Sequence, residues 1–253
     1  MQEECHPLSS SMKEYIERSY RKMVKATGLA SFQVSVKETD LWVSAGRNLE
    51  RETLDLVLDA RYQVESYIGS HPFFLKSLEP LPDDPTAPPL VREMLQTTRS
   101  VGVGPMASVA GAIAQYVGRG LLAHTDQVIV ENGGDIFLDV HRDVTVSVFA
   151  GESSLSHKIG ILAPKDRMPL GICTSSATVG PSLSLGATDA ACILSSSAAF
   201  ADAAATALGN MIQGKKDLQR IGTWAESIPG ILGCLVILGE HMAAWGEVEL
   251  VEL

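Results

Sequence analysis

The amino-acid sequence predicts an α+β fold in which a strand hairpin, helices and a second strand hairpin occur in that order twice. Apolar and polar residues alternate over 32–43, and two short apolar runs flank an Asn-Gly-Gly turn at 132–134, with helical periodicity between these two regions. The same order returns from Leu170 to the C-terminus. A period of two residues marks strands and a period of 3.6 marks helices. Their grouping into hairpins and helix pairs therefore favours an α+β fold with two related halves.

The first half combines strand and helix signals with a proline-rich connector. Glu50 and Glu52 suit the positive end of a helix dipole, so we expect Asn48 to cap a helix there. Five prolines fall within 79–90, and proline lacks the N–H that an inner strand or helix needs, which predicts an extended connector. The expected elements are a helix over 9–26, a hairpin over 32–43 with its turn at 38–40, a helix over 48–69 and a short helix over 91–98.

A glycine-rich approach leads to Pro105, where a helix of small residues begins. Proline is favourable as a first helical residue because its missing N–H would be unpaired there anyway. Ala107, Ala110, Gly111, Ala114 and Gly118 recur at helical spacing, so another backbone can approach closely. The first-turn N–H groups beside a flexible glycine approach can receive an anion.

A hairpin is expected after this helix. Residues 128–130 form its first strand, Asn132, Gly133 and Gly134 supply its turn, and 136–140 return as its second strand. Glu131 and Asp135 flank the turn and are the carboxylates best placed to lie near a pocket. A packed helix and hairpin without any site is the alternative reading, because Asn-Gly hairpins are common.

The second half has further short apolar runs and an alanine-rich helix. Gly214 is placed to cap that helix in the left-handed conformation. The expected elements are strands over 144–148, 159–163, 170–173 and 190–194, helices over 200–213 and 216–227, and a closing hairpin of 231–239 with 247–253.

Composition excludes several classes of protein. Thirty acidic against twenty basic residues give a formal charge of −10 in 253 residues, which would repel a nucleic-acid backbone. No apolar stretch reaches membrane-spanning length, and the N-terminus lacks the basic start and apolar core of a signal peptide. We therefore expect a cytoplasmic protein with neither nucleic acid nor membrane as a partner, and a homo-oligomer is compatible with the sequence.

Familiar catalytic motifs are absent. The four cysteines have no Cys-x-x-Cys spacing, which argues against a zinc knuckle and a disulfide framework. Gly102, Gly104 and Ala107 match G-x-G-x-x-A, but no buried strand precedes them as a dinucleotide fingerprint requires. No Walker loop or G-x-S-x-G elbow occurs. His124, His141, His157 and His241 lack ligand spacing and are expected in solvated turns.

Asp202 and Thr206 are four residues apart in the alanine-rich helix, so they lie on one face, one turn apart. A carboxylate and a hydroxyl are oxygen ligands of the kind that Mg²⁺ accepts, with water and phosphate completing its coordination. The alternative is a helix-dipole role for Asp202 and a backbone hydrogen bond for Thr206.

Thr174, Ser175 and Ser176 end a predicted strand in hydroxyl groups. They suit a phosphate or ribose contact and equally a polar turn. Cys173 precedes them at the apolar end of that strand, where a buried thiol and a nucleophile are the two alternatives.

Taken together, these motifs resemble the ApbE superfamily of FAD:protein FMN transferases. The resemblance rests on E-N-G-G-D-I at 131–136, T-S-S at 174–176 and A-D-A-A-A-T-A-L at 201–208. V-G-P-M-A-S-V-A-G-A-I-A at 103–114, with E-N-G-G-D, is more closely similar to the UPF0280 (DUF375) branch. The resemblance covers nearly the whole chain, from about Tyr20 to Gly239.

This resemblance implies a single ApbE-like domain over 1–253, made of two intertwined T-fold-like halves with a ligand cleft between them. It implies Mg²⁺ on Asp202 and Thr206 at the pyrophosphate of FAD or a related nucleotide. Asp135 and Cys173 are the candidate catalytic residues. The implied nucleotide contacts are Gly104, Pro105, Met106, Ala107, Ser108, Glu131, Asn132, Gly133, Gly134, Thr174, Ser175 and Ser176.

The chain departs from the transferases in one segment. They carry His-x-x-Asp-Pro-x-Thr-Gly between the serine motif and the last helix, and residues 181–194 here read P-S-L-S-L-G-A-T-D-A-A-C-I-L without a histidine. Three functions stay open. The first is a flavin transferase or a Mg²⁺-dependent flavin nucleotide hydrolase, and the second is a non-catalytic nucleotide-binding protein. The third, from the family's association with anaerobic sulfur metabolism, is a sulfur-handling protein that carries a persulfide on Cys173.

Overall fold

The computed structural model describes residues 28–176 and 186–253, so the helix expected over 9–26 lies outside the described residues. The first elements are β1 (Ala30–Val36), β2 (Thr39–Ala45), α1 (Glu50–Ser70), α2 (Phe73–Lys76), α3 (Pro89–Val101), η2 (Pro105–Ser108), α4 (Val109–Leu121), β3 (Val128–Asn132) and β4 (Asp135–Asp139). The next are β5 (Val144–Ser147), β6 (Ile159–Ala163), η3 (Lys165–Arg167), β7 (Leu170–Ser175) and β8 (Ala190–Ser195). The last are α5 (Ala198–Met211), η4 (Lys215–Arg220), α6 (Ile221–Glu226), β9 (Gly233–Leu238), β10 (His241–Gly246) and β11 (Glu249–Glu252).

Two antiparallel sheets organise the described residues, which confirms the α+β prediction. The larger sheet has eight strands in the order β1-β2-β3-β4-β7-β8-β9-β10. The smaller sheet has three strands in the order β11-β6-β5. Two strands followed by helices and two more strands occur from β1 to β4, and β7 to β10 repeat this order. In both cases the second and third strands pair directly, so the helices between them leave the sheet and return to it.

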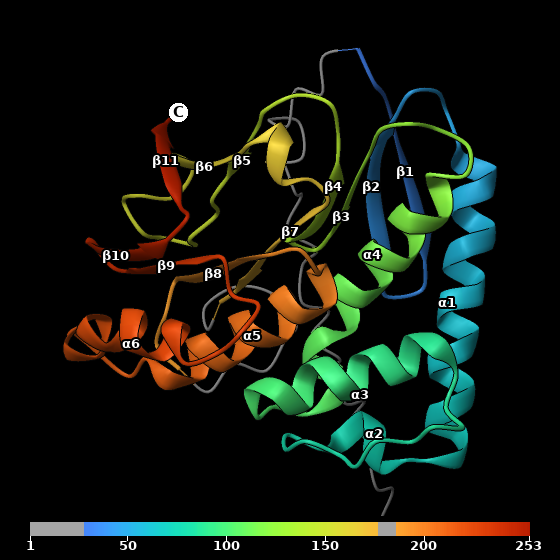
Figure 1. Ribbon diagram of the computed structural model, residues 1–253, viewed down its shortest axis with the longest axis horizontal. Helices are drawn as coiled ribbons and strands as arrows, with labels where there is room; N and C mark the ends of the chain where they lie inside the picture. The colour runs from blue at the N-terminus through green and yellow to red at the C-terminus, as the bar shows by residue number, and fades with distance from the viewer. Residues whose placement is uncertain (1–27, 177–185) are drawn as a thin grey trace, which may run out of the picture.

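The large sheet is the middle layer, with helices on one face and the small sheet toward the other (Figure 1). In the central strands β3, β4, β7, β8 and β9, alternating residues supply the two cores, as the period of two requires. In β8, for example, Ile193 packs with the helices and Leu194 packs with the small sheet. The helix-side core includes Val43, Phe137, Val64, Leu95, Val117 and Leu208, all buried.

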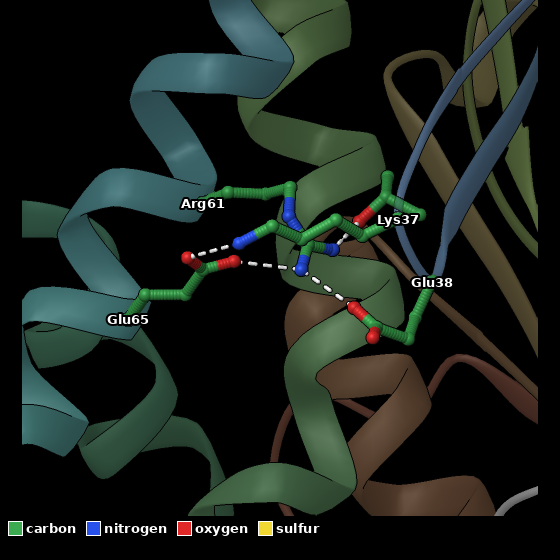
Figure 2. A network of polar contacts seen from close by, with 5 residues as sticks. Lys37, Glu38, Arg61 and Glu65 are labelled. Atoms are coloured by element: carbon green, nitrogen blue, oxygen red, sulfur yellow. Dashed lines mark hydrogen bonds and ion pairs between the residues drawn. The ribbon is translucent and has the colours of Figure 1, made fainter.

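The β1–β2 turn is tighter than predicted. It consists of Lys37 and Glu38, while Thr39 is a buried residue of β2. Lys37 takes the left-handed conformation with φ 52°. Arg61 on α1 fixes this turn by donating to Thr39 Oγ1 at 2.7 Å, Glu38 Oε2 at 2.6 Å and Glu65 Oε1 at 2.7 Å (Figure 2).

The residues from 79 to 88 belong to no helix or strand and include a turn in which the Ala87 amide donates to the Asp84 carbonyl at 3.1 Å. Pro89, which was placed in the predicted connector, instead begins α3 as a first helical residue. Asn48 was predicted to cap the helix that begins here, but the capping position directly before α1 is occupied by Leu49. Asn48 still contributes, because its Oδ1 accepts a hydrogen bond from the Glu50 amide at 2.9 Å. Leu49 is fully buried, so core packing fixes the helix start one residue later than the polar signal indicates.

A sharp bend joins α3 to η2 and α4. Gly102 ends α3 in the left-handed conformation with φ 78°. A Cβ on Gly104 would lie 1.9 Å from the carbonyl oxygen of Ser77, so the glycine approach is closely packed rather than open. Pro105 begins a 3-10 turn before the α-helix, and the two helical segments meet at 103°. Among the described residues, no single helix has the length and apolarity to cross a membrane, and only this bent pair meets both criteria together.

Two predictions in the second half are wrong. Gly214 does not cap α5, because the helix ends at Met211 and Gly214 is extended with φ −177°. Ile212 is fully buried, and this packing turns the chain out of the helix before the glycine. The helix expected over 216–227 is divided into η4 and α6.

The prediction for the closing hairpin, which paired 231–239 with 247–253, is also wrong. β9 pairs with β10, so His241 begins a strand instead of lying in a turn. Glu249–Glu252 pairs with β6 in the small sheet. The sequence of β10, H-M-A-A-W-G, has only weak alternation because the strand lies at an edge and is largely exposed.

Candidate functional site

The candidate site lies where β4 and β7 meet the first turns of α4 and α5. Asp135 begins β4 and faces Cys173 of β7 in register. Asp202 lies one turn into α5, and its Oδ2 accepts the backbone amide of Gly111 at 2.8 Å. We call Asp135, Cys173 and Asp202 the carboxylate cluster. The sequence predicted all three as site residues, and the structure brings them together.

Local sequence explains why each member points toward the helices. The Gly133–Gly134 turn has φ values of 71° and 106°, so the chain reverses in two residues and Asn132 stays in β3. Asp135 then shares the helix-facing side of β4 with Phe137. On β7, Cys173 faces the same side and its thiol donates to the carbonyl of Ala198 at 3.3 Å.

Close packing of α4 on α5 depends on Gly111. A Cβ there would lie 2.3 Å from the carbonyl oxygen of Ala198 and 2.7 Å from Cβ of Asp202. The predicted approach of another backbone to the small-residue helix is thus confirmed, and the backbone is that of α5. The anion that the first turn of this helix receives is the side chain of Asp202 from the same chain.

Burial shifts the protonation of the cluster. Desolvation raises the pKa of Asp202 to about 7, although hydrogen bonds from the Gly111 and Ala110 backbone oppose the shift. Desolvation also raises the pKa of Asp135 well above its ordinary value, and the nearby charges of Asp202 and Glu131 add to this. Oδ1 of Asp135 is buried and has no hydrogen-bond partner among the described residues. A cation placed here would offset the cost of burying Asp135 beside the half-buried Asp202.

Cys173 is buried completely, and burial raises the pKa of its thiol well above the ordinary value. The charges of Asp135 and Asp202 act in the same direction. The thiol is therefore protonated at neutral pH. Because the thiolate is the nucleophile, this environment does not support a reactive cysteine.

The hydroxyl-rich end of β7 divides between the two faces of the sheet. Thr174 Oγ1 donates to Cys192 Sγ at 3.2 Å, on the face away from the carboxylate cluster. Ser175 is buried and falls on the helix-facing side by alternation. Ser176 follows the strand and is partly buried.

The remaining predicted residues border the cluster at three places. Asn132 Nδ2 donates to the carbonyl of Ala110 at 3.0 Å, and Glu131 Oε1 accepts the amide of Gly134 at 3.0 Å. Thr206 is half-buried one turn after Asp202. The segment from Gly104 to Ser108 packs against α5, with Pro105 and Ser108 buried and Met106 and Ala107 half-buried.

Sequence reasoning missed Gln115. This fully buried residue of α4 accepts the amide of Ala198 through Oε1 at 2.8 Å and donates through Nε2 to Glu93 Oε1 at 2.5 Å. Its position one turn after Gly111, on the face already assigned to close packing, was the available signal.

Comparison with known proteins identifies the family. The family model described as AbpE bacteria matches residues 21–227. A UPF0280 protein of Methanocella arvoryzae is 40% identical over 212 residues, covering 83% of this chain and 86% of the relative. One from Methanosarcina barkeri is 38% identical over 226 residues, covering 87% and 89%.

Solved structures show the same fold. The apo flavinyl transferase ApbE of Pseudomonas stutzeri has a TM-score of 0.55 at 13% identity, with 85% of this chain and 93% of that chain covered. The flavin transferase ApbE of Vibrio cholerae has a TM-score of 0.55 at 11% identity, with 88% and 96% covered. Together with the sequence matches, this shows that the chain belongs to the ApbE-like UPF0280 family, whose model is described as AbpE bacteria.

Proposed function

We propose that this chain binds a flavin dinucleotide or a related nucleotide together with Mg²⁺, beside the carboxylate cluster. The observation that carries the proposal is a pair of carboxylates, buried Asp135 and half-buried Asp202, with Oδ1 of Asp135 lacking a hydrogen-bond partner among the described residues. A buried carboxylate beside a second, half-buried one needs a compensating positive charge or a proton. The family's relation to flavin transferases supplies the ligand class.

Mg²⁺ fits these residues in its ligand preference. It binds oxygen, retains several waters and takes only one or two carboxylates together with substrate phosphates. No group of three or more His, Cys, Asp or Glu side chains in the described ranges is arranged to hold a metal ion. Asp202, with Thr206 on the same helix face, would therefore hold the ion, and the pyrophosphate and water would complete its coordination. The ion would supply positive charge to the phosphates.

The nucleotide would lie along η2, the start of α4 and the β3–β4 turn, as the resemblance implies. Ala107, Ser108 and the Gly133–Gly134 turn leave little side-chain bulk along this path. The role of these residues is recognition and orientation. The interval 181–194 has no histidine, so the residues named here account for binding and supply no proton-transfer group of that kind.

Isothermal titration with FAD tests the proposal. We expect FAD to bind in Mg²⁺ and to lose most of its affinity in excess EDTA, with ADP and riboflavin each binding more weakly than FAD. FAD binding that is equal in EDTA would contradict the role of the metal. Absence of binding to all three ligands would contradict a flavin nucleotide function.

Chromatography of the same mixtures separates binding from catalysis. Release of FMN and AMP from FAD in Mg²⁺ would identify a flavin nucleotide hydrolase, and covalent FMN on an added acceptor protein would identify a transferase. Intact FAD after prolonged incubation would leave a nucleotide-binding protein as the function.

A further inference from the structure

Two hydrogen bonds connect α4 to α5 at positions one helical turn apart. Gly111 donates to Asp202, and one turn later on α4 the side chain of Gln115 accepts the amide of Ala198, one turn earlier on α5. The two helices therefore run in opposite directions along this contact. The hydrogen bond from Gly111 holds Asp202, a proposed metal ligand, and the hydrogen bond to Gln115 holds Ala198, the first residue of α5.

Gln115 has both ends of its amide engaged. Oε1 accepts from Ala198 N at 2.8 Å, and Nε2 donates to Glu93 Oε1 at 2.5 Å. Glu93 lies on α3 with a side chain that is 28% exposed and also pairs with Arg119 at 3.5 Å. The buried amide thus joins α3, α4 and the start of α5. A buried polar group with both functions satisfied holds its neighbours in one geometry, because any shift would leave a buried atom unpaired.

The start of α5 matters because several site contacts begin there. The carbonyl of Ala198 accepts the Cys173 thiol at 3.3 Å and limits how close Gly111 can approach. Asp202 follows one turn later, on the same face. A displacement of Ala198 would consequently move Asp202 relative to Gly111 and to Asp135.

We propose that Gln115 is a positioning residue of the flavin and Mg²⁺ site, which fixes the start of α5 so that Asp202 points to the metal position. This inference rests on the proposed function for its binding readout. The hydrogen bonds of Gln115 go to Ala198 and Glu93 and not to Asp135 or Asp202, so the proposed role does not require contact with the ligand. Its effect is therefore on the affinity for the ion, as for other residues that orient metal ligands from behind.

Exchanging the two polar partners tests the role. Gln115→Glu alone keeps an acceptor for the Ala198 amide but places two carboxylates against each other at positions 115 and 93. The double variant Gln115→Glu with Glu93→Gln restores the hydrogen bond between these two side chains with donor and acceptor exchanged. We expect the single variant to raise the Mg²⁺ concentration for half-maximal FAD binding by roughly tenfold or more, and the double variant to recover most of the loss. Ile161→Ala, in the other core, controls for lost stability and is expected to leave the Mg²⁺ requirement unchanged.

Hydrogen exchange gives a readout that does not depend on the ligand. In Gln115→Glu, exchange at the amides of 109–112 should be accelerated relative to the wild type, and exchange at 117–121 of the same helix should change less. The double variant should return the rates at 109–112 toward those of the wild type. If the wild type binds no flavin, the proposed function fails while exchange still decides the positioning role. Unchanged exchange at Gly111 together with an unchanged Mg²⁺ requirement in the single variant would overturn the inference.

Discussion

Asp135 lies directly opposite Cys173 across β4 and β7, and burial raises the pKa of both groups. The charge of Asp135 raises the pKa of the thiol further. The Asp202 carboxylate, on α5, is near enough to Asp135 for its charge to raise the pKa of Asp135 as well. This concentration of acid groups away from water has measurable consequences.

Asp202→Asn should stabilise the protein more at pH 8 than at pH 5. An aspartate in the unfolded chain releases its proton near pH 4, whereas Asp202 in the folded chain retains it up to about pH 7. Between these values the folded state binds more protons, so the free energy of unfolding falls as pH rises through that window. The asparagine side chain would avoid this loss and keep an acceptor for Gly111. Thermal unfolding of the wild type and the variant at the two pH values measures this stabilisation. Equal stabilisation at pH 5 and pH 8 would contradict the raised pKa of Asp202.

Native Cys173 should resist alkylation. Its thiol is buried and its pKa is well above the ordinary value, so little thiolate is present even at pH 8. Mass spectrometry after iodoacetamide treatment should find this cysteine modified only in denaturant. Rapid labelling of Cys173 in the native protein would instead favour the sulfur-handling alternative, and loss of function in Cys173→Ser would strengthen that result.

Gly111→Ala should destabilise the fold and impair the site together. The added methyl group would collide with the Ala198 carbonyl and with Asp202, which forces α4 and α5 apart. We expect a loss of about 1–3 kcal/mol in the free energy of unfolding, the usual cost of overpacking. The matched control is Gly69→Ala in α1, where a Cβ meets nothing within 4 Å and a gain of about 0.5–1 kcal/mol is expected. Urea unfolding compares the two, and an equal response would refute the close-packing role.

The predictability of the fold differs between its elements for physical reasons. β6 was predicted at its observed bounds, because its short apolar run lies directly between Lys158 and Pro164. The prediction that Gly214 caps α5 was wrong because a left-handed helix cap and an extended glycine share one sequence signal. The turn around Gly133 was predictable from local sequence, since only a few residue types accept its backbone conformation.

Part of the candidate site was equally local. Spacing alone placed Asp202 and Thr206 on one helix face, and strand alternation relates Asp135 to its neighbours. The contacts Gly111–Asp202 and Gln115–Ala198 join residues 91 and 83 positions apart. Such contacts depend on how α4 packs on α5, which local patterns do not specify. The small residues of α4 indicated that another backbone would approach this helix closely, but they did not identify α5 as that partner.

Arg61→Ala should weaken the attachment of the β1–β2 turn to α1. Arg61 is 13% exposed and donates to three acceptors in the network of Figure 2. We expect a loss of about 1–3 kcal/mol in the free energy of unfolding, because a partly buried charged donor is removed from several partners. Lys37→Ala removes a more exposed ion pair with Glu65 and should cost about 0–1 kcal/mol. Equal costs in chemical denaturation would show that burial of Arg61 adds nothing.

Titration of FAD in Mg²⁺ against the wild type and Asp202→Ala tests most directly whether Asp202 holds Mg²⁺ for a flavin nucleotide. We expect Mg²⁺-dependent binding of FAD in the wild type and its loss in Asp202→Ala, a variant that should remain folded by circular dichroism. Undiminished Mg²⁺-dependent binding of FAD to Asp202→Ala would contradict the assignment.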